Sequence, residues 1–382
     1  MPRQSFNFSL FLFNYYAYAG TFVTYVSLFF AARGMTVPQI GVLVSLVQVM
    51  RIFGPNLWGW VADHTEQRVK VLRLTGVAAL LSFCCFFIAD GFAAFFIVMV
   101  LLNLFTSAQA PLSEALMLSE MRGDLSHYGR VRLWGSIGFI VAVVAAGYLL
   151  EWYGVDAMLW ICSVLLVLVI MSALRIREQA HPVGHHDKPR LLNVLRRPEV
   201  ATFFLSAALM CGAHMALYVF YSLYLERAGY SKPVIGGIWA LGVVAEVAFF
   251  YFQARVFERF GARRIMMFAF GVALLRFVIT GAGADWLWVL VAAQLMHAAT
   301  FAAHHSACVL TMQRWFAGPL QASGQALLIS IGYGVGGTLG GLFLSYCWDS
   351  ISPEAVYYGA AGMTLAGAIA ARHSFKLAGR LV

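Results

Sequence analysis

Residues 59–70 read Gly-Trp-Val-Ala-Asp-His-Thr-Glu-Gln-Arg-Val-Lys, and residues 254–264 read Ala-Arg-Val-Phe-Glu-Arg-Phe-Gly-Ala-Arg-Arg. One shift of the chain places the acid of the first stretch, Asp63, on Glu258 and its arginine, Arg68, on Arg263. The same shift aligns further pairs on both sides, namely Pro38 with Pro233, Gly41 with Gly236 and Gly76 with Gly271. The sequence therefore contains an internal repeat of two related halves.

The composition around these stretches is that of a protein that lies in lipid. Of 382 residues, 61% are hydrophobic and 11% are charged, whereas soluble domains carry about 25% charged residues. Twelve apolar stretches of about 20 residues recur along the chain, and this length crosses ~30 Å of hydrocarbon. The sequence predicts an all-α membrane protein with twelve transmembrane helices in two pseudo-symmetric six-helix bundles.

The basic residues indicate how the chain crosses the membrane. The formal net charge is +9, but Lys and Arg are spread over alternate connections, which argues against a nucleic-acid surface. Only Arg33, Arg227 and Lys232 lie in the connections on the opposite side. Basic residues concentrate on the cytoplasmic side of membrane proteins, so we expect both termini in the cytoplasm. We expect a multi-pass monomer in the lipid bilayer of a bacterial inner membrane.

The longest polar interruption, from Arg175 to Glu199, separates the two halves. We predict an N-terminal bundle over residues 1–175, a cytoplasmic linker over residues 176–199 and a C-terminal bundle over residues 200–382. The linker contains three histidines that form either a metal site or a solvated loop, and the absence of cysteine ligands beside them favours the loop: His181, His185 and His186. The six cysteines of the chain lack the spacing of a metal site, so we expect no bound metal.

Two related bundles of membrane helices are typical of secondary transporters, in which the bundles rock about a site near the bilayer midplane. Both quoted stretches resemble the loop between helices 2 and 3 of major facilitator transporters. The resemblance implies a gating motif, an ion-pair latch that closes in one access state, formed by Asp63, Arg68, Glu258 and Arg263. The alternative is a basic cytoplasmic loop with a helix cap. The first copy has Gln67 and Arg68 where the family has a glycine, so we expect its turn to differ from the second.

Five ionisable side chains lie within the apolar stretches: Arg51, Glu114, Arg132, Glu246 and Arg276. Each costs about 2.5–3.5 kcal/mol to insert and marks a candidate functional site. Glu246 stands among apolar residues, which favour its protonated form. We interpret Glu246 as a proton carrier and Arg276 as the cation whose approach expels the proton. A static pair that locks two helices is the alternative.

Histidines, tyrosines and glycines give weaker signals. His214 and His297 lie in apolar stretches, where a histidine either functions or hydrogen-bonds a neighbouring helix. Two tyrosine stripes either stack on a planar ring of a solute or pack the helices: Tyr15, Tyr18, Phe22 and Tyr25 in the first stretch, and Tyr218, Tyr221 and Tyr224 in the seventh. Glycines at four-residue intervals predict close contact between helices: Gly332, Gly336 and Gly340.

The resemblance becomes more specific in helices 4 and 5. Residues 111–115 read Pro-Leu-Ser-Glu-Ala, and residues 128–136 read Tyr-Gly-Arg-Val-Arg-Leu-Trp-Gly-Ser. This pattern resembles the lactose permease group of proton symporters and, around the Arg-x-Trp-Gly segment, the nucleoside proton symporters. Together with residues 212–214, 228–231 and 239–247, it is similar to the phenylpropionate permease family.

The resemblance implies that Glu114 and Arg132 bind substrate and that Glu246, Arg276 and His297 couple transport to protons. The tyrosine stripes, the intramembrane charge and the histidine of helix 7 add four substrate-binding candidates: Tyr18, Arg51, His214 and Tyr218. Lactose-type symporters keep an acid three residues after the matching histidine, where this chain has Thr300. The proton is therefore expected on Glu246, Glu114 or His297.

These features predict a proton-coupled importer of a small organic solute, with an aromatic carboxylate favoured over a sugar or a nucleoside. The proton gradient would drive it without a cofactor. The alternative is an exporter or a proton-independent facilitator of a metabolite, a drug or a metal-chelating compound. An enzyme is not indicated, because the sequence lacks a nucleotide-binding loop, a metal triad and a nucleophile paired with a base.

Overall fold

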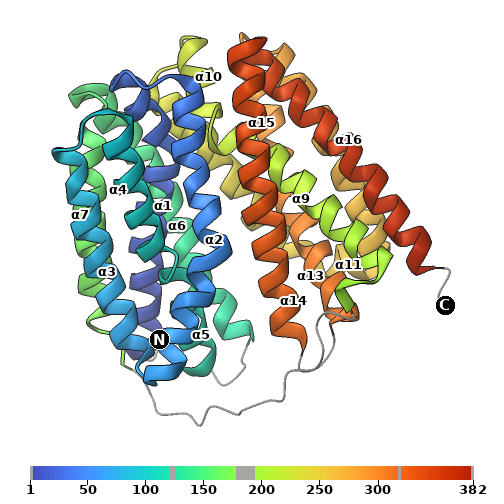
Figure 1. Ribbon diagram of the computed structural model, residues 1–382, viewed down its shortest axis with the longest axis horizontal. Coiled ribbons are helices and arrows are strands. Elements are labelled where there is room, and N and C mark those ends of the chain that lie inside the picture. The colour runs from blue at the N-terminus through green and yellow to red at the C-terminus, as the bar shows by residue number, and fades with distance from the viewer. Residues whose placement is uncertain (1–2, 121–124, 178–193, 317–319, 380–382) are drawn as a thin grey trace. The chain divides into compact units, whose positions relative to one another are not determined.

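The computed structural model describes residues 3–120, 125–177, 194–316 and 320–379 (Figure 1). Helices make up nearly all of this part of the chain, and no strand occurs in it. The α-helices are α1 (Arg3–Ala32), α2 (Val37–Thr65), α3 (Arg68–Cys84), α4 (Gly91–Thr106), α5 (Gln109–Glu120), α6 (Leu125–Tyr153), α7 (Ala157–Ala173), α9 (Pro198–Tyr218), α10 (Tyr221–Arg227), α11 (Lys232–Ala282), α12 (Leu287–Leu295), α13 (His304–Trp315), α14 (Gln321–Leu327), α15 (Gly337–Ser350) and α16 (Pro353–Ala378). A 3₁₀ turn, η1 (Cys85–Phe87), and two π-helical segments, η2 (Ala298–Ala303) and η4 (Leu328–Gly336), join some of them.

Eight helical segments of the described chain are long and apolar enough to cross a membrane. They are Val37–Thr65, Arg68–Phe87, Gly91–Glu120, His127–Tyr153, Pro198–Arg227, Lys232–Ala282, Leu287–Trp315 and Ser323–Ser350. The all-helical membrane character predicted from the sequence is confirmed, whereas the predicted number of twelve is not. The segment Lys232–Ala282 has 51 residues, and its backbone leaves the helical conformation at Gly261, where two helices meet.

Contacts along the chain group it into two compact units. Unit 1 comprises Met1–Val183 with Gly229–Ala240, and unit 2 comprises Gly184–Ala228 with Leu241–Val382. Because Gly229–Ala240 belongs to unit 1, the first turns of α11 pack within that unit. Most of the predicted linker lies outside the described residues.

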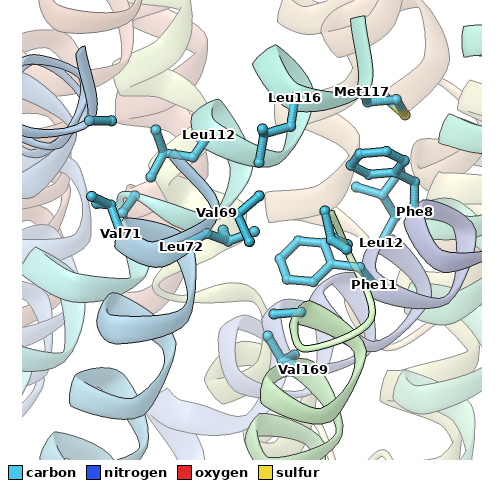
Figure 2. Close-up of a cluster of buried hydrophobic side chains, with 14 of the residues drawn as sticks. Phe8, Phe11, Leu12, Val69, Val71, Leu72, Leu112, Leu116, Met117 and Val169 are labelled. Carbon is cyan, nitrogen blue, oxygen red and sulfur yellow. The ribbon is translucent and has the colours of Figure 1, made fainter. Parts of the chain in front are cut away.

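Unit 1 is built around α1, which packs against α6 and α7. A Cβ at Gly138 of α6 would collide with the backbone of Phe13, so the absence of a side chain lets the two helices approach closely. Figure 2 shows part of the core, where apolar side chains of α1, α3, α5 and α7 meet: Phe8, Phe11, Leu12, Val69, Val71, Leu72, Leu112, Leu116, Met117 and Val169. Arg73 ties α3 to α7, because its guanidinium donates to the carbonyls of Ala173, Leu174 and Ile176.

The start of α11 is held in unit 1 by contacts with α1 and α6. The buried Tyr25 hydroxyl of α1 donates to the carbonyl of Val143 at 2.9 Å. A Cβ at Gly236 of α11 would collide with that hydroxyl and with Val143. The carboxylate of Glu151 accepts from the backbone N–H of Lys232 at 3.0 Å, and so caps the first turn of α11.

Unit 2 is built around α9, which packs against α15, α16 and η4. A Cβ at Gly336 would collide with the backbone of Ala208, and a Cβ at Gly340 would collide with that of Gly212. The predicted close approach of helices is therefore confirmed at Gly336 and Gly340, whereas a Cβ at Gly332 would meet no atom closer than 3.7 Å.

The two repeat loops turn at equivalent positions. Glu66 ends α2 with φ 52° and ψ 28°, in the left-handed helical region. The residue aligned with it, Gly261, has φ 73° and ψ 155°, a conformation that only glycine adopts readily. The glycine of the family pattern is therefore replaced by Glu66, and assigning the departure to Gln67 and Arg68 was wrong. The two turns do differ, because their ψ angles differ.

Gly261→Ala is expected to lower the free energy of unfolding by about 1–3 kcal/mol, because alanine is strained in this conformation. Space does not limit the substitution, since no atom lies within 4 Å of a Cβ placed there. The matched control is Gly271→Ala in the helical part of α11, which is equally open and is expected to be neutral or stabilising. Unfolding in detergent micelles would be measured, and equal stability of the two variants would contradict the prediction.

Candidate functional site

The predicted charged residues form two groups, one within each unit. In unit 1, Arg132 of α6 lies beside Glu114 of α5. In unit 2, His297 contacts both Glu246 and Arg276. Each group also contains neutral partners, which determine what the charges can do.

The unit 1 group is an ion pair over an aromatic ring. Arg132 Nε lies 3.5 Å from Glu114 Oε1. Its Nη2 donates to the Tyr16 hydroxyl at 2.8 Å, and the guanidinium lies 4.3 Å from the centre of the Tyr16 ring. The side chains of Arg132 and Glu114 are 32% and 36% exposed, so the protein does not enclose them completely.

The sequence around Arg132 makes room for the ring. A Cβ at Gly135 would lie 2.7 Å from the Tyr16 ring and 3.0 Å from Arg132 Nη1. Gly135 therefore allows Tyr16 and Arg132 to stack. Tyr16 was not predicted from the sequence, although the glycine three residues after Arg132 is a signal for a bulky neighbour.

The unit 2 group surrounds Arg276, whose side chain is fully buried. Arg276 Nη1 lies 2.7 Å from His297 Nδ1 and donates to Thr300 Oγ1 at 2.8 Å. Nη2 donates to Gln294 Oε1 at 2.8 Å. Buried charge is tolerated only when it is paired and hydrogen-bonded. These contacts, from the end of α12 and from η2, provide partners for both Nη atoms, whereas Nε has no hydrogen-bond partner among the described residues.

His297 bridges the cation and the acid. Its Nε2 lies 2.8 Å from Glu246 Oε1. Because a guanidinium can only donate, His297 Nδ1 must accept from Arg276 and carry no proton. Neutral His297 then has its proton on Nε2 and donates to Glu246. The imidazole of His297 thus lies between Arg276 and Glu246, and hydrogen bonds in such a chain polarise one another.

His214 of α9 also belongs to this network. Its Nδ1 is 2.8 Å from the Met210 carbonyl and its Nε2 is 3.2 Å from Thr300 Oγ1. The side chain is 3% exposed, so the residue proposed as a substrate contact belongs to the buried network in this structure. Gln294 and Thr300 were not predicted as members, because neutral polar residues in a helix give no signal of their own.

Of the other substrate-binding candidates, Arg51 and Tyr218 lie within electrostatic reach of the two groups, and Tyr18 lies in the packing of the helices. Tyr18 is buried against Phe22 and Phe83 in the packing of α1 and α3. Arg51 is exposed on α2, and its charge acts on Tyr15. Tyr218 is half-buried at the end of α9, and it acts electrostatically on Arg276.

The gating motif is arranged differently in its two copies. Arg68 Nη2 lies 3.0 Å from Asp63 Oδ1, and Asp63 is 59% exposed. In the second copy, Glu258 is exposed and Arg263 lies over the Phe375 ring at 5.8 Å. Within the described part of the chain, the motif forms its acid–arginine ion pair in the first copy alone.

The described residues contain no cluster of three or more His, Cys, Asp or Glu side chains that could hold a metal ion. The cysteines of this part are free thiols. The linker histidines His181, His185 and His186 lie outside the described residues.

Membrane-spanning helices, an internal repeat and charge groups held within the apolar helices define a transporter of small solutes. The chain belongs to the MFS_1-like family of major facilitator transporters, whose family model matches residues 5–359. Proteins of this family are transporters and not enzymes.

Individual relatives agree with this class. The chain is 29% identical over 303 residues to a probable 3-phenylpropionic acid transporter of Escherichia coli (strain K12), with 78% of this chain and 79% of the relative covered. It is 27% identical over 321 residues to a maltose permease of Geobacillus stearothermophilus, with 81% and 79% covered. A solved structure of a variant of the nucleoside transporter NupG superposes with a TM-score of 0.87 at 18% identity, over 97% of this chain and 100% of that chain. This last match shows the fold.

The difference in burial between the two groups predicts different responses to the same substitution. Arg276→Met is expected to lower the free energy of unfolding by about 3–5 kcal/mol, because it leaves buried acceptors and the Glu246 carboxylate without a cation. Arg132→Met is expected to cost about 1 kcal/mol or less, because water can replace the lost partner. Chemical unfolding of both variants in micelles would measure this. Equal losses of unfolding free energy would contradict the assignment of Arg276 to a buried group and of Arg132 to an accessible one.

Proposed function

We propose that the protein is a proton-coupled importer that carries a small aromatic carboxylate by alternating access. It crosses a bacterial inner membrane as a monomer through twelve helices, and both termini lie in the cytoplasm. Residues 1–175 and 200–382 form two six-helix bundles, joined by a cytoplasmic linker over residues 176–199. No cofactor takes part, because the proton gradient supplies the driving force.

One observation carries this proposal: among the described residues, Glu246 contacts His297, and His297 also contacts the fully buried guanidinium of Arg276. In the ionised state, the Glu246 carboxylate balances the charge of Arg276 through the imidazole. A proton on Glu246 removes this balance and leaves the guanidinium as the only charge of the group. Because electrostatic interactions are strong where water is excluded, protonation would shift the preference of unit 2 between conformations by several kcal/mol.

The unit 1 pair suits the solute. Arg132 and Glu114 are each about one third exposed, so a carboxylate can exchange with Glu114 on the guanidinium. The Tyr16 ring that Arg132 covers offers an aromatic surface beside this charge. The similarity to a probable 3-phenylpropionic acid transporter supports a phenyl-substituted acid. Glu114 released from Arg132 would be free to bind a proton, which links solute binding to protonation.

The ion pair of Asp63 with Arg68 supports a role of the motif loop in gating. An exposed ion pair contributes about 0–1 kcal/mol. Such a small contribution is suited to a contact that must break in each cycle. Glu258 and Arg263 would form the corresponding contact in the second half in another access state.

Glu246→Gln is expected to abolish accumulation of 3-phenylpropionate driven by an inward pH gradient, because glutamine holds its hydrogens permanently and cannot release a proton. Uptake of radiolabelled substrate into proteoliposomes, with and without the gradient, would measure this. Exchange of internal for external substrate at equal pH should fall much less, since it requires no net proton release. The matched control is Glu354→Gln at the start of α16, which should accumulate as the unmodified protein does.

Accumulation by Glu246→Gln, or uptake by the unmodified protein that is indifferent to the pH gradient, would contradict proton coupling. The second result would favour a proton-independent facilitator. Gradient-driven efflux in place of uptake would identify an exporter.

Removal of the solute carboxylate tests the role of Arg132. The neutral isostere 3-phenylpropionamide is expected to bind about 10- to 100-fold more weakly than 3-phenylpropionate, because a hydrogen bond to a charged group contributes about 1.5–3 kcal/mol. Arg132→Gln should bind both compounds equally weakly. Calorimetric titration of the purified protein would measure the affinities, with maltose and uridine as competitors. If maltose or uridine bound more tightly than 3-phenylpropionate, the substrate would be a sugar or a nucleoside and not an aromatic acid.

A further inference from the structure

Thr300 lies where the two branches of the unit 2 network meet. Its hydroxyl accepts from Arg276 Nη1 at 2.8 Å. The same oxygen is 3.2 Å from His214 Nε2 and 3.4 Å from the carbonyl of His297. Thr300 is fully buried, so water does not compete for these contacts.

The direction of each hydrogen bond follows from the donors that are present. His214 Nδ1 faces the Met210 carbonyl, which can only accept, so the ring proton is on Nδ1. His214 Nε2 is then an acceptor. Thr300 donates its single hydrogen to it and not to the His297 carbonyl, because the contact with His214 is the shorter one, 3.2 Å against 3.4 Å. The hydroxyl thus points its lone pairs at Arg276. This donation orients Thr300 to receive the guanidinium.

Arg276 depends on this orientation. Its Nε has no hydrogen-bond partner among the described residues. The guanidinium is held through Nη1 by His297 and Thr300 and through Nη2 by Gln294. Without Thr300, Nη1 would keep one contact of its present two. The cation would then be free to rotate away from His297 Nδ1.

We propose that Thr300 and His214 are positioning residues for the proton site: together they hold Arg276 on His297, and through His297 they set how firmly Glu246 retains its proton. This inference rests on the proposed proton coupling and adds two residues that touch neither the solute nor the transferred proton. Where the lactose permease group has a protonatable acid, this chain uses a neutral hydroxyl that orients a cation.

The charged and titratable groups around the site define its electrostatic setting. Besides Glu246, three tyrosines act on Arg276: Tyr218, Tyr221 and Tyr357. His305 of α13 interacts with Glu246, and His304 interacts with His214. Arg276 is the permanent cation among them, so its distance from His297 controls the stability of the Glu246 carboxylate.

Thr300→Val tests the proposal, because valine keeps the shape of threonine and removes the hydroxyl. The readout is the carboxyl C=O infrared band of purified protein during a pH titration, assigned to Glu246 by its loss in Glu246→Gln. The pH at which half of this band disappears is expected to rise by about 0.5–1 pH unit, because an opposite charge that moves away stabilises the carboxylate less. Thr300→Ser should restore the original midpoint, and His214→Phe should shift it in the same direction as Thr300→Val.

The control is Thr311→Val in α13, a buried threonine whose hydroxyl donates to the Ala307 carbonyl of its own helix. It should lose stability without moving the midpoint. A midpoint in Thr300→Val equal to that of the unmodified protein, or an equal shift in Thr311→Val, would overturn the proposal. The titration requires no substrate, so it is independent of the transport assay. If the midpoint shifts but no pH-driven uptake is found, the positioning role stands and the proposed function fails.

Discussion

A permanently charged guanidinium with no exposed surface is the constraint that organises unit 2. Moving an ion out of water costs several kcal/mol even after relaxation, so Arg276 requires partners placed to match its planar donors. His297, Thr300 and Gln294 supply them from the junction of α12 with η2. His297 and Phe301 are four positions apart, so their side chains lie on one face of the helix. The rings of His297 and Phe301 accordingly lie parallel within 10°, at 5.3 Å between centres.

Unit 1 holds its arginine in a different way. Arg132 has an acid partner and an aromatic ring, but one third of its side chain remains accessible. Solvent can therefore replace any partner at modest cost, and so can a solute. The two arginines have the same chemistry and differ in access to water. That difference makes Arg132 suitable for exchange of partners, and Arg276 suitable for holding a fixed electrostatic field on Glu246.

The features predicted from the sequence are those with a strong physical signal. Charges within apolar stretches are costly, so Glu246, Arg276 and His297 stood out, and the structure brings them into contact. Neutral members such as Thr300 and Gln294 have no such cost, and their importance depends on which helices pack together. His214 was recognised as polar, but its burial depends on the packing of α9 against η2, which no local pattern reveals. Helix ends are hard to predict for the same reason. Two helices meet at Gly261 because its backbone leaves the helical conformation, and the composition of the sequence does not change there.

The two halves share related sequences and have diverged in chemistry at some of the repeated positions. Asp63 forms an ion pair with Arg68, whereas Arg263 rests on an aromatic ring. In the first loop the chain turns at Glu66, whose backbone is in the left-handed helical region. In the second it turns at Gly261, in a conformation that only glycine adopts readily. The proposed coupling requires this divergence, because two identical sites would bind the same species and could not make binding of one depend on the other. A repeat supplies two states related by symmetry, and the asymmetric charges decide which species stabilises each state.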